Sequence, residues 1–495
     1  MKNITRCLLL AFTMALGGNW VTSGGDPART GLSDEFGPTQ PDLVWQGTVN
    51  GLFGLPVFIW QDRLVTCRFQ TIDYAPIVCQ SIDDGRIIWT RDFPGTNSRS
   101  IPVGFRDNRV YAINFQESHY DTLYALSPDN GTTIWRARMT VEMSITESVT
   151  FCENGDLLVQ GSGFKIARIN CMNGDTVWTC YRLWPVTGSC DLCVFGNTAY
   201  GYYGTIAGIS LIAIDLATGR IRDSVRLQDM HPGGPTPQAA PMVGPDGTIY
   251  AHVVGDNITA VRDSGDSLKV LWVREISVSP YSPFAHFAVG PDSTVYVASN
   301  GRILRLDPAD GMAIDSSLPI NDGNIFQCRL AIDRAGRVYA SNGGFSSGAL
   351  YCFSQDLELR WSVPVASINT SGPAIGSDGI LTVAGNGTTL LAYRTPTATR
   401  DLPARPRPVP MLLARPNPFR SRTAISLRSA VVSSSGLTIY DAGGARVRTL
   451  QADSYERPAI STFVWDGCDQ SGRRMPAGAY IGEAGGTTIS LVLTR

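Results

Sequence analysis

The sequence has few charged residues and only four histidines. Charged residues make up 17% of the 495, and the formal net charge is -2. A chain this close to neutral has no electrostatic reason to bind nucleic acid or an anionic membrane, so neither is expected as a partner. The four histidines are His119, His231, His252 and His286. They show no H-x-H or H-x-x-x-H spacing, so the sequence gives no support to a histidine metal centre or a haem ligand pair.

Long apolar runs are also missing. The run near the N-terminus, CLLLAFTMALG, has about 11 residues, whereas about 20 are needed to span a bilayer. Lys2 and Arg6 precede this run, and small residues follow from Ala15 to Gly18, as in a cleaved export signal. We therefore expect residues 1–18 to be a signal peptide and the mature chain to be secreted, with no transmembrane segment. A short membrane anchor is the alternative.

Ten cysteines remain after the predicted signal, and an oxidising compartment would allow some to form disulfides. Cys67 and Cys79 are the best pair if a hairpin centred near Asp73 brings them opposite each other. Four cysteines form a cluster within 23 residues: Cys171, Cys180, Cys190 and Cys193. The alternatives for this cluster are zinc binding, disulfides between the third and fourth repeats, and buried free thiols. Its spacing matches no four-cysteine zinc pattern well, which favours the last two.

Glycine and proline are abundant, with 51 and 30 residues, and favour many short strands and turns. The segment Leu123–Trp135, LYALSPDNGTTIW, predicts two strands joined by a tight turn at Asn130-Gly131. Its tryptophan lies four residues after the glycine. The same offset recurs at Trp89 and Trp178, and two further copies carry an aspartate in place of the aromatic residue, Asp223 and Asp315.

These copies follow one another with a period in the low forties, at positions 45, 89, 135, 178, 223, 272, 315 and 361. Four strand-like runs per period are typical of propeller blades, and the copies predict eight blades. Residues 373–394 supply only three strands of the last blade. We expect the strand Leu43–Val49 to complete it and close the ring, which removes open sheet edges. The tryptophans are expected to pack between neighbouring blades: Trp45, Trp89, Trp135, Trp178, Trp272 and Trp361.

A family resemblance rests on these residues. GGDPARTG, then GPTQPDLVW, then copies of L-x-A-[IL]-D-x-x-[TD]-G-x-x-x-W resemble the PQQ-like repeat propellers over residues 19–395. That group includes quinoprotein dehydrogenases and the non-enzymatic outer-membrane assembly lipoprotein. Catalysis with the quinone would require calcium, a carboxylate base and flat apolar surfaces around the cofactor. The adjacent-cysteine disulfide of quinoprotein alcohol dehydrogenases has no counterpart, because no Cys-Cys occurs.

The C-terminal part differs in composition. Residues 396–411 are rich in proline, as in an extended linker. Residues 412–495 predict about seven short strands, which suggests an immunoglobulin-like sandwich. Asn417-Pro418-Phe419, Trp465-Asp466-Gly467 and Pro476 to Tyr480 resemble the FlgD-type immunoglobulin-like domain and the C-terminal sorting domain of the type IX secretion system. This resemblance implies a secretion or surface-attachment tag. A plain adhesion or spacer module is the alternative.

The sequence thus predicts an all-β protein, an eight-bladed propeller followed by a small sandwich. The favoured function is a secreted, non-enzymatic surface that binds protein or polysaccharide outside the cell, with the C-terminal domain contacting the secretion machinery. A periplasmic location is less favoured. No catalytic, cofactor-binding or metal-binding residue is expected; PQQ with calcium enters only under the alternative of a dehydrogenase with a divergent pocket. Trp184 and His231, in loops at one mouth of the channel, are candidate ligand contacts.

Overall fold

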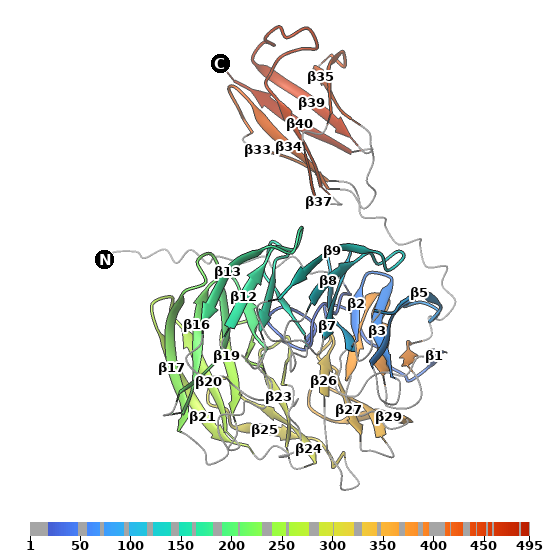
Figure 1. Ribbon diagram of the computed structural model, residues 1–495, viewed down its shortest axis with the longest axis vertical. Helices are drawn as coiled ribbons and strands as arrows, with labels where there is room; N and C mark the ends of the chain where they lie inside the picture. The colour runs from blue at the N-terminus through green and yellow to red at the C-terminus, as the bar shows by residue number, and fades with distance from the viewer. Residues whose placement is uncertain are drawn as a thin grey trace. The chain divides into compact units, whose positions relative to one another are not determined.

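The computed structural model describes most of the chain in two compact units, Met1–Pro396 and Thr397–Arg495. Figure 1 shows the strands of both units. The described residues are 18–47, 57–69, 74–93, 99–115, 122–139, 148–160, 165–181, 191–205, 208–229, 240–253, 257–276, 287–299, 301–320, 329–343, 348–365, 372–384, 390–395, 411–415, 417–428, 436–441, 443–451, 454–457, 460–484 and 487–494.

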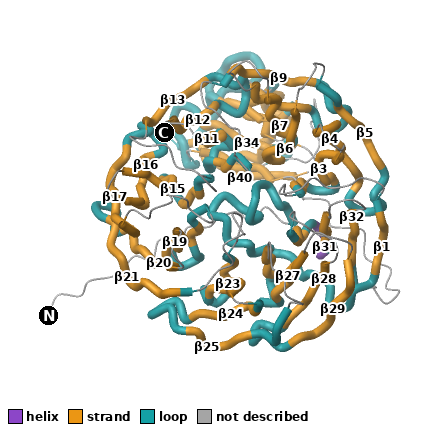
Figure 2. Tube along the Cα trace, turned by 60° about the horizontal axis from the view of Figure 1, so that its bottom comes forward, coloured by secondary structure: helices purple, strands orange, loops and turns teal. Residues whose placement is uncertain are grey.

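The described residues of the first unit form eight four-stranded antiparallel sheets, which Figure 2 shows arranged around a common centre. Sheets 1 to 4 comprise β2 (Phe58–Trp60), β3 (Arg63–Phe69), β4 (Tyr74–Ser81), β5 (Ile87–Arg91); β6 (Arg99–Arg106), β7 (Arg109–Phe115), β8 (Thr122–Leu126), β9 (Thr133–Arg138); β10 (Thr150–Phe151), β11 (Leu157–Gln160), β12 (Lys165–Ile169), β13 (Thr176–Tyr181); and β14 (Cys193–Phe195), β15 (Thr198–Thr205), β16 (Gly208–Asp215), β17 (Ile221–Asp229).

Sheets 5 to 7 continue the same meander along the chain. They comprise β18 (Met242–Val243), β19 (Thr248–Val253), β20 (Asn257–Asp263), β21 (Leu268–Glu275); β22 (Ala288–Val289), β23 (Val295–Ser299), β24 (Arg302–Leu306), β25 (Ala313–Ser316); and β26 (Arg329–Ile332), β27 (Val338–Gly343), β28 (Gly348–Phe353), β29 (Leu359–Val365). Because each sheet is an antiparallel meander, the turns after its first and third strands lie at one face of the ring. We call this the turn face, and the opposite one the loop face.

Sheet 8 takes its strands from both ends of the repeat region, as predicted. It comprises β30 (Pro373–Ile375), β31 (Leu381–Ala384), β32 (Leu390–Tyr393) and, as its outer strand, β1 (Leu43–Gln46), with the 3-10 turn η1 (Ser377–Gly379) between β30 and β31. Trp45 pairs with Ala392 and Gln46 with Leu391. The amide of Arg394 also donates to the Asp42 carbonyl at 3.0 Å.

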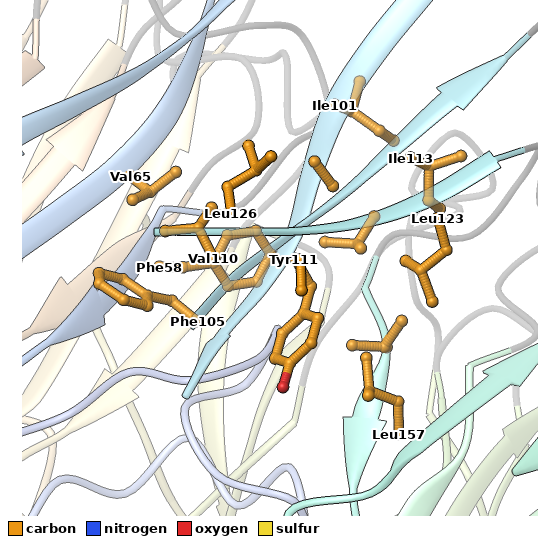
Figure 3. Close-up of a cluster of buried hydrophobic side chains, with 14 of the residues drawn as sticks. Phe58, Val65, Ile101, Phe105, Val110, Tyr111, Ile113, Leu123, Leu126 and Leu157 are labelled. Carbon is orange, nitrogen blue, oxygen red and sulfur yellow. The ribbon is translucent and has the colours of Figure 1, made fainter. Parts of the chain in front are cut away.

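Burial falls from the first strand of each sheet to the fourth. β22, a first strand, is buried along its whole length, whereas β9, a fourth strand, buries only Trp135 and exposes most of its other residues. Apolar side chains from neighbouring sheets fill the space between them. Figure 3 shows one such region, where Phe58 of sheet 1 lies near Phe105 and Val110 of sheet 2. The fully buried aromatic and aliphatic side chains supply the main stabilisation of the ring.

Five of the six tryptophans on the outer strands lie against a turn glycine of the next sheet. Glycine is required there for two reasons: its φ is positive, and a Cβ atom would lie 2.5–2.7 Å from the indole ring. The pairs are Trp45 with Gly85, Trp89 with Gly131, Trp135 with Gly174, Trp178 with Gly219, and Trp272 with Gly311. Each indole N–H of these five also donates to a carbonyl of the neighbouring turn, at 2.7–2.9 Å.

The two repeats with aspartate lack this contact. Asp223 accepts a hydrogen bond from the Leu268 amide at 2.6 Å, and a Cβ atom on the turn glycine opposite it, Gly265, would have no neighbouring atom within 4 Å. Asp315 lies on the outer strand of sheet 6. In the next sheet, the turn between β28 and β29 has its positive φ at Leu357 rather than at a glycine. Loss of the tryptophan therefore coincides with relief of the steric demand on the neighbouring turn.

A matched pair of substitutions measures the indole contact. Gly131→Ala and Gly265→Ala both place a Cβ at positive φ, but only the first meets a ring, that of Trp89. We expect Gly131→Ala to lower the free energy of unfolding by roughly 1–3 kcal/mol more than Gly265→Ala, the usual cost of overpacking. Denaturant titration of both variants beside the parent chain checks this; equal losses would contradict it.

The described residues of the second unit form a sandwich of two four-stranded sheets, eight strands where about seven were predicted. One sheet has the order β33 (Met411–Arg415), β34 (Thr423–Arg428), β38 (Ile460–Trp465), β37 (Ser454–Arg457), and the other β36 (Arg446–Leu450), β35 (Leu437–Asp441), β39 (Gly478–Ala484), β40 (Thr487–Leu493). Trp465 is fully buried between Phe419 and Tyr480, with ring centroids 5.4 and 5.0 Å away. Asn417 lies beside β40, where its side-chain carbonyl accepts from Val492 N at 2.8 Å.

The cysteine pairing expected from the hairpin near Asp73 is wrong. Cys67 lies opposite Ile77 and Cys79 opposite Val65, because β3 and β4 pair in a register two residues away from the one that would place the two cysteines opposite each other. Cys67 and Cys79 are both free thiols, and no group of three or more metal-ligating side chains occurs among the described residues. Burial raises the pKa of four thiols to about 12, so they are protonated at neutral pH: Cys79, Cys152, Cys193 and Cys352. Cys190 and Cys328 lie outside the described residues.

Candidate functional site: the axial segment and the inner strands

Residues 18–37, which we call the axial segment, run past the first strands of the sheets. The sequence shows this stretch only as a glycine- and proline-rich lead-in. Its carbonyls accept hydrogen bonds from first-strand amides of six sheets, at 2.7–3.0 Å: Trp20 from Ile59, Val21 from Phe105, Pro27 from Val194, Ala28 from Val243, Thr30 from Val289 and Gly31 from Ile332. Sheet 3 contributes the hydroxyl of Thr150, which donates to Pro27 at 3.2 Å.

Arg29 holds the middle of the axial segment. Its side chain is 3% exposed and its guanidinium donates to the carbonyls of Leu192 and Ser23, at 2.7 and 2.9 Å. It also donates to the Ser148 hydroxyl at 3.1 Å and lies 3.4 Å from the carboxylate of Asp191, which is 1% exposed. A buried cation with this set of acceptors is satisfied as an ion pair and as a hydrogen-bond donor. The network joins the axial segment to sheets 3 and 4.

A second buried acid holds the end of the segment. Asp333, fully buried on sheet 7, accepts from the Gly37 amide at 2.9 Å and pairs with Arg337 at 2.6 Å. Tyr339 donates to the carbonyl of Pro38 at 3.0 Å. Burial raises the pKa of Asp333, partly offset by the Arg337 guanidinium. These contacts position the chain where it leaves the axis toward β1.

The buried ion pair makes a direct test of how the axial segment is held. Arg29→Met leaves the Asp191 carboxylate buried without its cation, and we expect it to lower the free energy of unfolding by about 3–5 kcal/mol. Asp191→Asn in the same chain should restore part of that loss, since the buried charge is then gone. Chemical denaturation of the two single variants and the double variant gives the coupling; strictly additive losses would argue against a paired interaction.

Buried polar side chains also occur on the inner strands toward the loop face. They include Ser100, Asn114, Gln160, His252, Ser299, Arg329 and Ser341. The amide of Asn114 donates to the Ser100 hydroxyl at 2.7 Å. His252 is 1% exposed, packs edge-on against Phe287, and has no hydrogen-bond partner for either ring nitrogen among the described residues. Burial lowers the pKa of His252 to about 4.

This histidine predicts a specific acid sensitivity. The unfolded chain takes up a proton near pH 6.5 and the folded chain only near pH 4, so stability is lost as the pH falls through this window. The difference corresponds to about 3 kcal/mol. His252→Phe should therefore flatten the dependence of the unfolding free energy on pH between 6.5 and 4, relative to the parent chain. An unchanged slope in denaturant titrations at several pH values would show that His252 is not the group responsible.

The predicted ligand-loop residues, Trp184 and His231, lie outside the described residues. The described tryptophans of the repeats lie on outer strands, away from the first strands. The sequence also contains a motif that the prediction missed: residues 344–348 spell Gly-Phe-Ser-Ser-Gly, the pattern of a nucleophile elbow. An elbow joins a strand to a helix. Here Gly343 and Gly348 pair across the antiparallel hairpin of β27 and β28, so we assign the motif no catalytic role.

The described residues do not fit a quinone cofactor with calcium. No group of three or more metal-ligating side chains occurs in the described ranges, and five of the six repeat indoles are in contact with turn glycines. The buried acids near the axis are already paired or hydrogen-bonded: Asp191 lies by Arg29, and Asp333 by Arg337. We therefore derive no chemical step through such a cofactor.

Comparison with known proteins gives two family matches. Residues 75–315 match the family described as outer membrane protein assembly factor BamB, and residues 419–488 match the FlgD Ig-like domain. The first unit is a PQQ-like repeat β-propeller and the second an FlgD-type Ig-like domain. The all-β fold predicted from the sequence is confirmed. Among curated proteins, no relative matches the chain.

Solved structures similar to the propeller come from proteins of different kinds. Quinohemoprotein alcohol dehydrogenase from Comamonas testosteroni has a TM-score of 0.56 at 12% identity, covering 77% of this chain and 82% of its own. BamB from Moraxella catarrhalis has 0.50 at 12%, covering 72% and 99%. A computationally designed protein, Ika8, has 0.51 at 12%, covering 71% and 99%. Likeness at this identity shows the fold alone. In the described part of the chain, no helix is long and apolar enough to cross a membrane.

Proposed function

We propose that this propeller is an exported, non-enzymatic binding protein that acts outside the cell or at its surface. The observation that supports this best is the axial segment: the chain's own backbone and the Arg29 side chain occupy the turn-face side of the axis and tie the first strands together. Such an arrangement suits a rigid platform whose outer surface meets a partner. The N-terminal sequence and the C-terminal domain support export.

The outer strands offer a surface for a protein partner or a polysaccharide. Apolar side chains exposed by 37% or more occur on these strands, and they are Leu43, Val44, Ile87, Ile134, Val177, Ile221, Val270, Leu271, Val273, Ile314 and Leu359. Three of these lie within four positions of β21. Exposed apolar side chains gathered on an edge strand mark a site of protein contact more often than one of sugar binding. A protein partner is therefore the favoured case.

A binding experiment with an activity arm tests the proposal. Purified protein is screened against cell-surface proteins, peptidoglycan and polysaccharide, and the same preparation is tested for dye reduction with added PQQ, calcium and alcohols. We expect a bound surface component and no reduction. Leu271→Lys should weaken protein binding at least tenfold, and Ile134→Lys on β9, a similarly exposed position, should not. Turnover with PQQ and no bound component would favour the dehydrogenase alternative.

We also propose that the C-terminal domain directs the protein to the cell surface. Its compact fold is separate from the propeller, which lets it contact secretion machinery without altering the ring. Cell fractionation of the full chain and of a chain ending at Pro396 tests this. The full chain should reach the surface or medium, and the shortened chain should remain inside the outer boundary of the cell with an unchanged thermal midpoint. Equal distribution of both chains would indicate a spacer or adhesion module instead.

A further inference from the structure

The first described residue, Gly18, is buried and bonded at the start of the axial segment. Its backbone nitrogen donates to the carboxylate of Asp34 at 2.9 Å. Asp34 lies 16 residues later, near the other end of the axial segment. The two ends of this segment are therefore joined through one backbone nitrogen and one carboxylate.

The packing around Gly18 leaves no space for a side chain. A Cβ atom at this position would lie 2.3 Å from Cα of Ser377 on η1, and the φ of 64° is itself unfavourable for other residues. Ser377 in turn donates to the Gln61 carbonyl at 2.9 Å, and the Gln61 amide donates to Asn19 at 2.6 Å. The start of the axial segment is thus placed closely between η1 and the turn joining β2 and β3.

The sequence before Gly18 fits removal of a signal at this point. Export signals end with small residues at the third and first positions before the cleaved bond. Ala15 and Gly17 occupy those two positions when the bond cleaved is the one between Gly17 and Gly18. The signal then ends one residue earlier than the predicted range of residues 1–18.

We propose that the bond between Gly17 and Gly18 is the processing site, and that the α-ammonium it releases forms an ion pair with Asp34. The proposal rests on export of the chain. A signal-removing protease hydrolyses the amide with one water: Gly17 leaves as a carboxylate, and the Gly18 nitrogen takes up a proton as the free amine becomes an ammonium. The neutral N–H donor seen at 2.9 Å then becomes a charged donor, which strengthens the hydrogen bond.

The surroundings favour an ammonium at this position. Acidic side chains predominate on the segments packed around Gly18: Asp34 and Glu35 on the axial segment, Asp378 on η1 and Asp62 on the β2–β3 turn. The neighbouring cation, Arg63 at the start of β3, is paired with Asp62 at 3.0 Å. Asp34 is half-buried and Asp378 is exposed, so Asp34 provides the stronger partner.

The first experiment determines the N-terminus of the exported protein by intact mass and N-terminal sequencing. A chain that begins at Gly18 supports the proposal. An exported chain that begins at Leu16 or Asn19 overturns it while leaving export intact. Full-length protein retained in the cytoplasm overturns both this proposal and the proposed location.

The second experiment measures what the ammonium does. Chains that begin at Gly18 and at Gly17 are prepared by scarless cleavage of a fusion, each with Asp34 and with Asp34→Asn. At pH 7 the chain that begins at Gly18 should have a thermal midpoint higher by roughly 2–4 °C, and Asp34→Asn should remove that difference. Glu35→Gln, the matched control, should keep it. No difference between the two starts, or one that persists in Asp34→Asn, overturns the ion pair.

The pH dependence gives an independent readout. A free α-amino group has a pKa of about 7.7–8.0, and pairing with a carboxylate raises this pKa in the folded chain. The stabilisation is therefore complete below pH 7 and is lost as the pH rises through the folded value. At pH 10 the midpoints of the two chains should converge. A difference that is the same at pH 7 and pH 10 would show that packing, rather than charge, distinguishes them.

Discussion

The pairing of β1 with β32 is the interaction on which the ring depends. It joins Leu43–Gln46 to Leu390–Tyr393, segments almost 350 residues apart, through a few backbone hydrogen bonds. Closing so large a loop carries an entropic cost that short pairing alone offsets poorly. The axial segment reduces this entropic cost. Its hydrogen bonds to the first strands hold the residues that precede β1 in the chain close to the centre of the ring.

The contacts between sheets follow one rule with two kinds of exception. Where an outer strand carries tryptophan and a tight turn joins the third and fourth strands of the next sheet, the indole packs against a glycine in that turn. Where aspartate replaces tryptophan, the constraint on the turn disappears. Trp361 is the remaining case: the third and fourth strands of sheet 8 come from opposite ends of the chain, so no turn joins them, and its indole N–H has no acceptor in the described ranges. The irregularity lies where the ring is closed.

The sequence predicted the fold because its signal is repeated. The Gly-to-Trp offset, the period and the missing fourth strand near residue 394 each constrain the same architecture. It could not predict the path of residues 18–37, since hydrogen bonds made by backbone carbonyls leave no pattern in side chains. The positive φ of Arg29 and its pairing with Asp191 likewise depend on tertiary contacts between distant residues. The Cys67–Cys79 prediction was wrong because the register of β3 and β4 differs by two residues from the one assumed, and side-chain pattern alone does not fix a hairpin's register to that precision.

Threading of the axial segment through the centre has a consequence for the order in which the molecule assembles. Residues 18–37 are among the first to be synthesised, yet their hydrogen-bond partners are spread over sheets 1 to 7, and Gly18 packs against Ser377 of sheet 8. The complete set of partners exists only after the last repeat has emerged. A chain that leaves the cell N-terminus first therefore remains without its central contacts during transit, and reaches its final topology only when nearly all of the propeller has crossed.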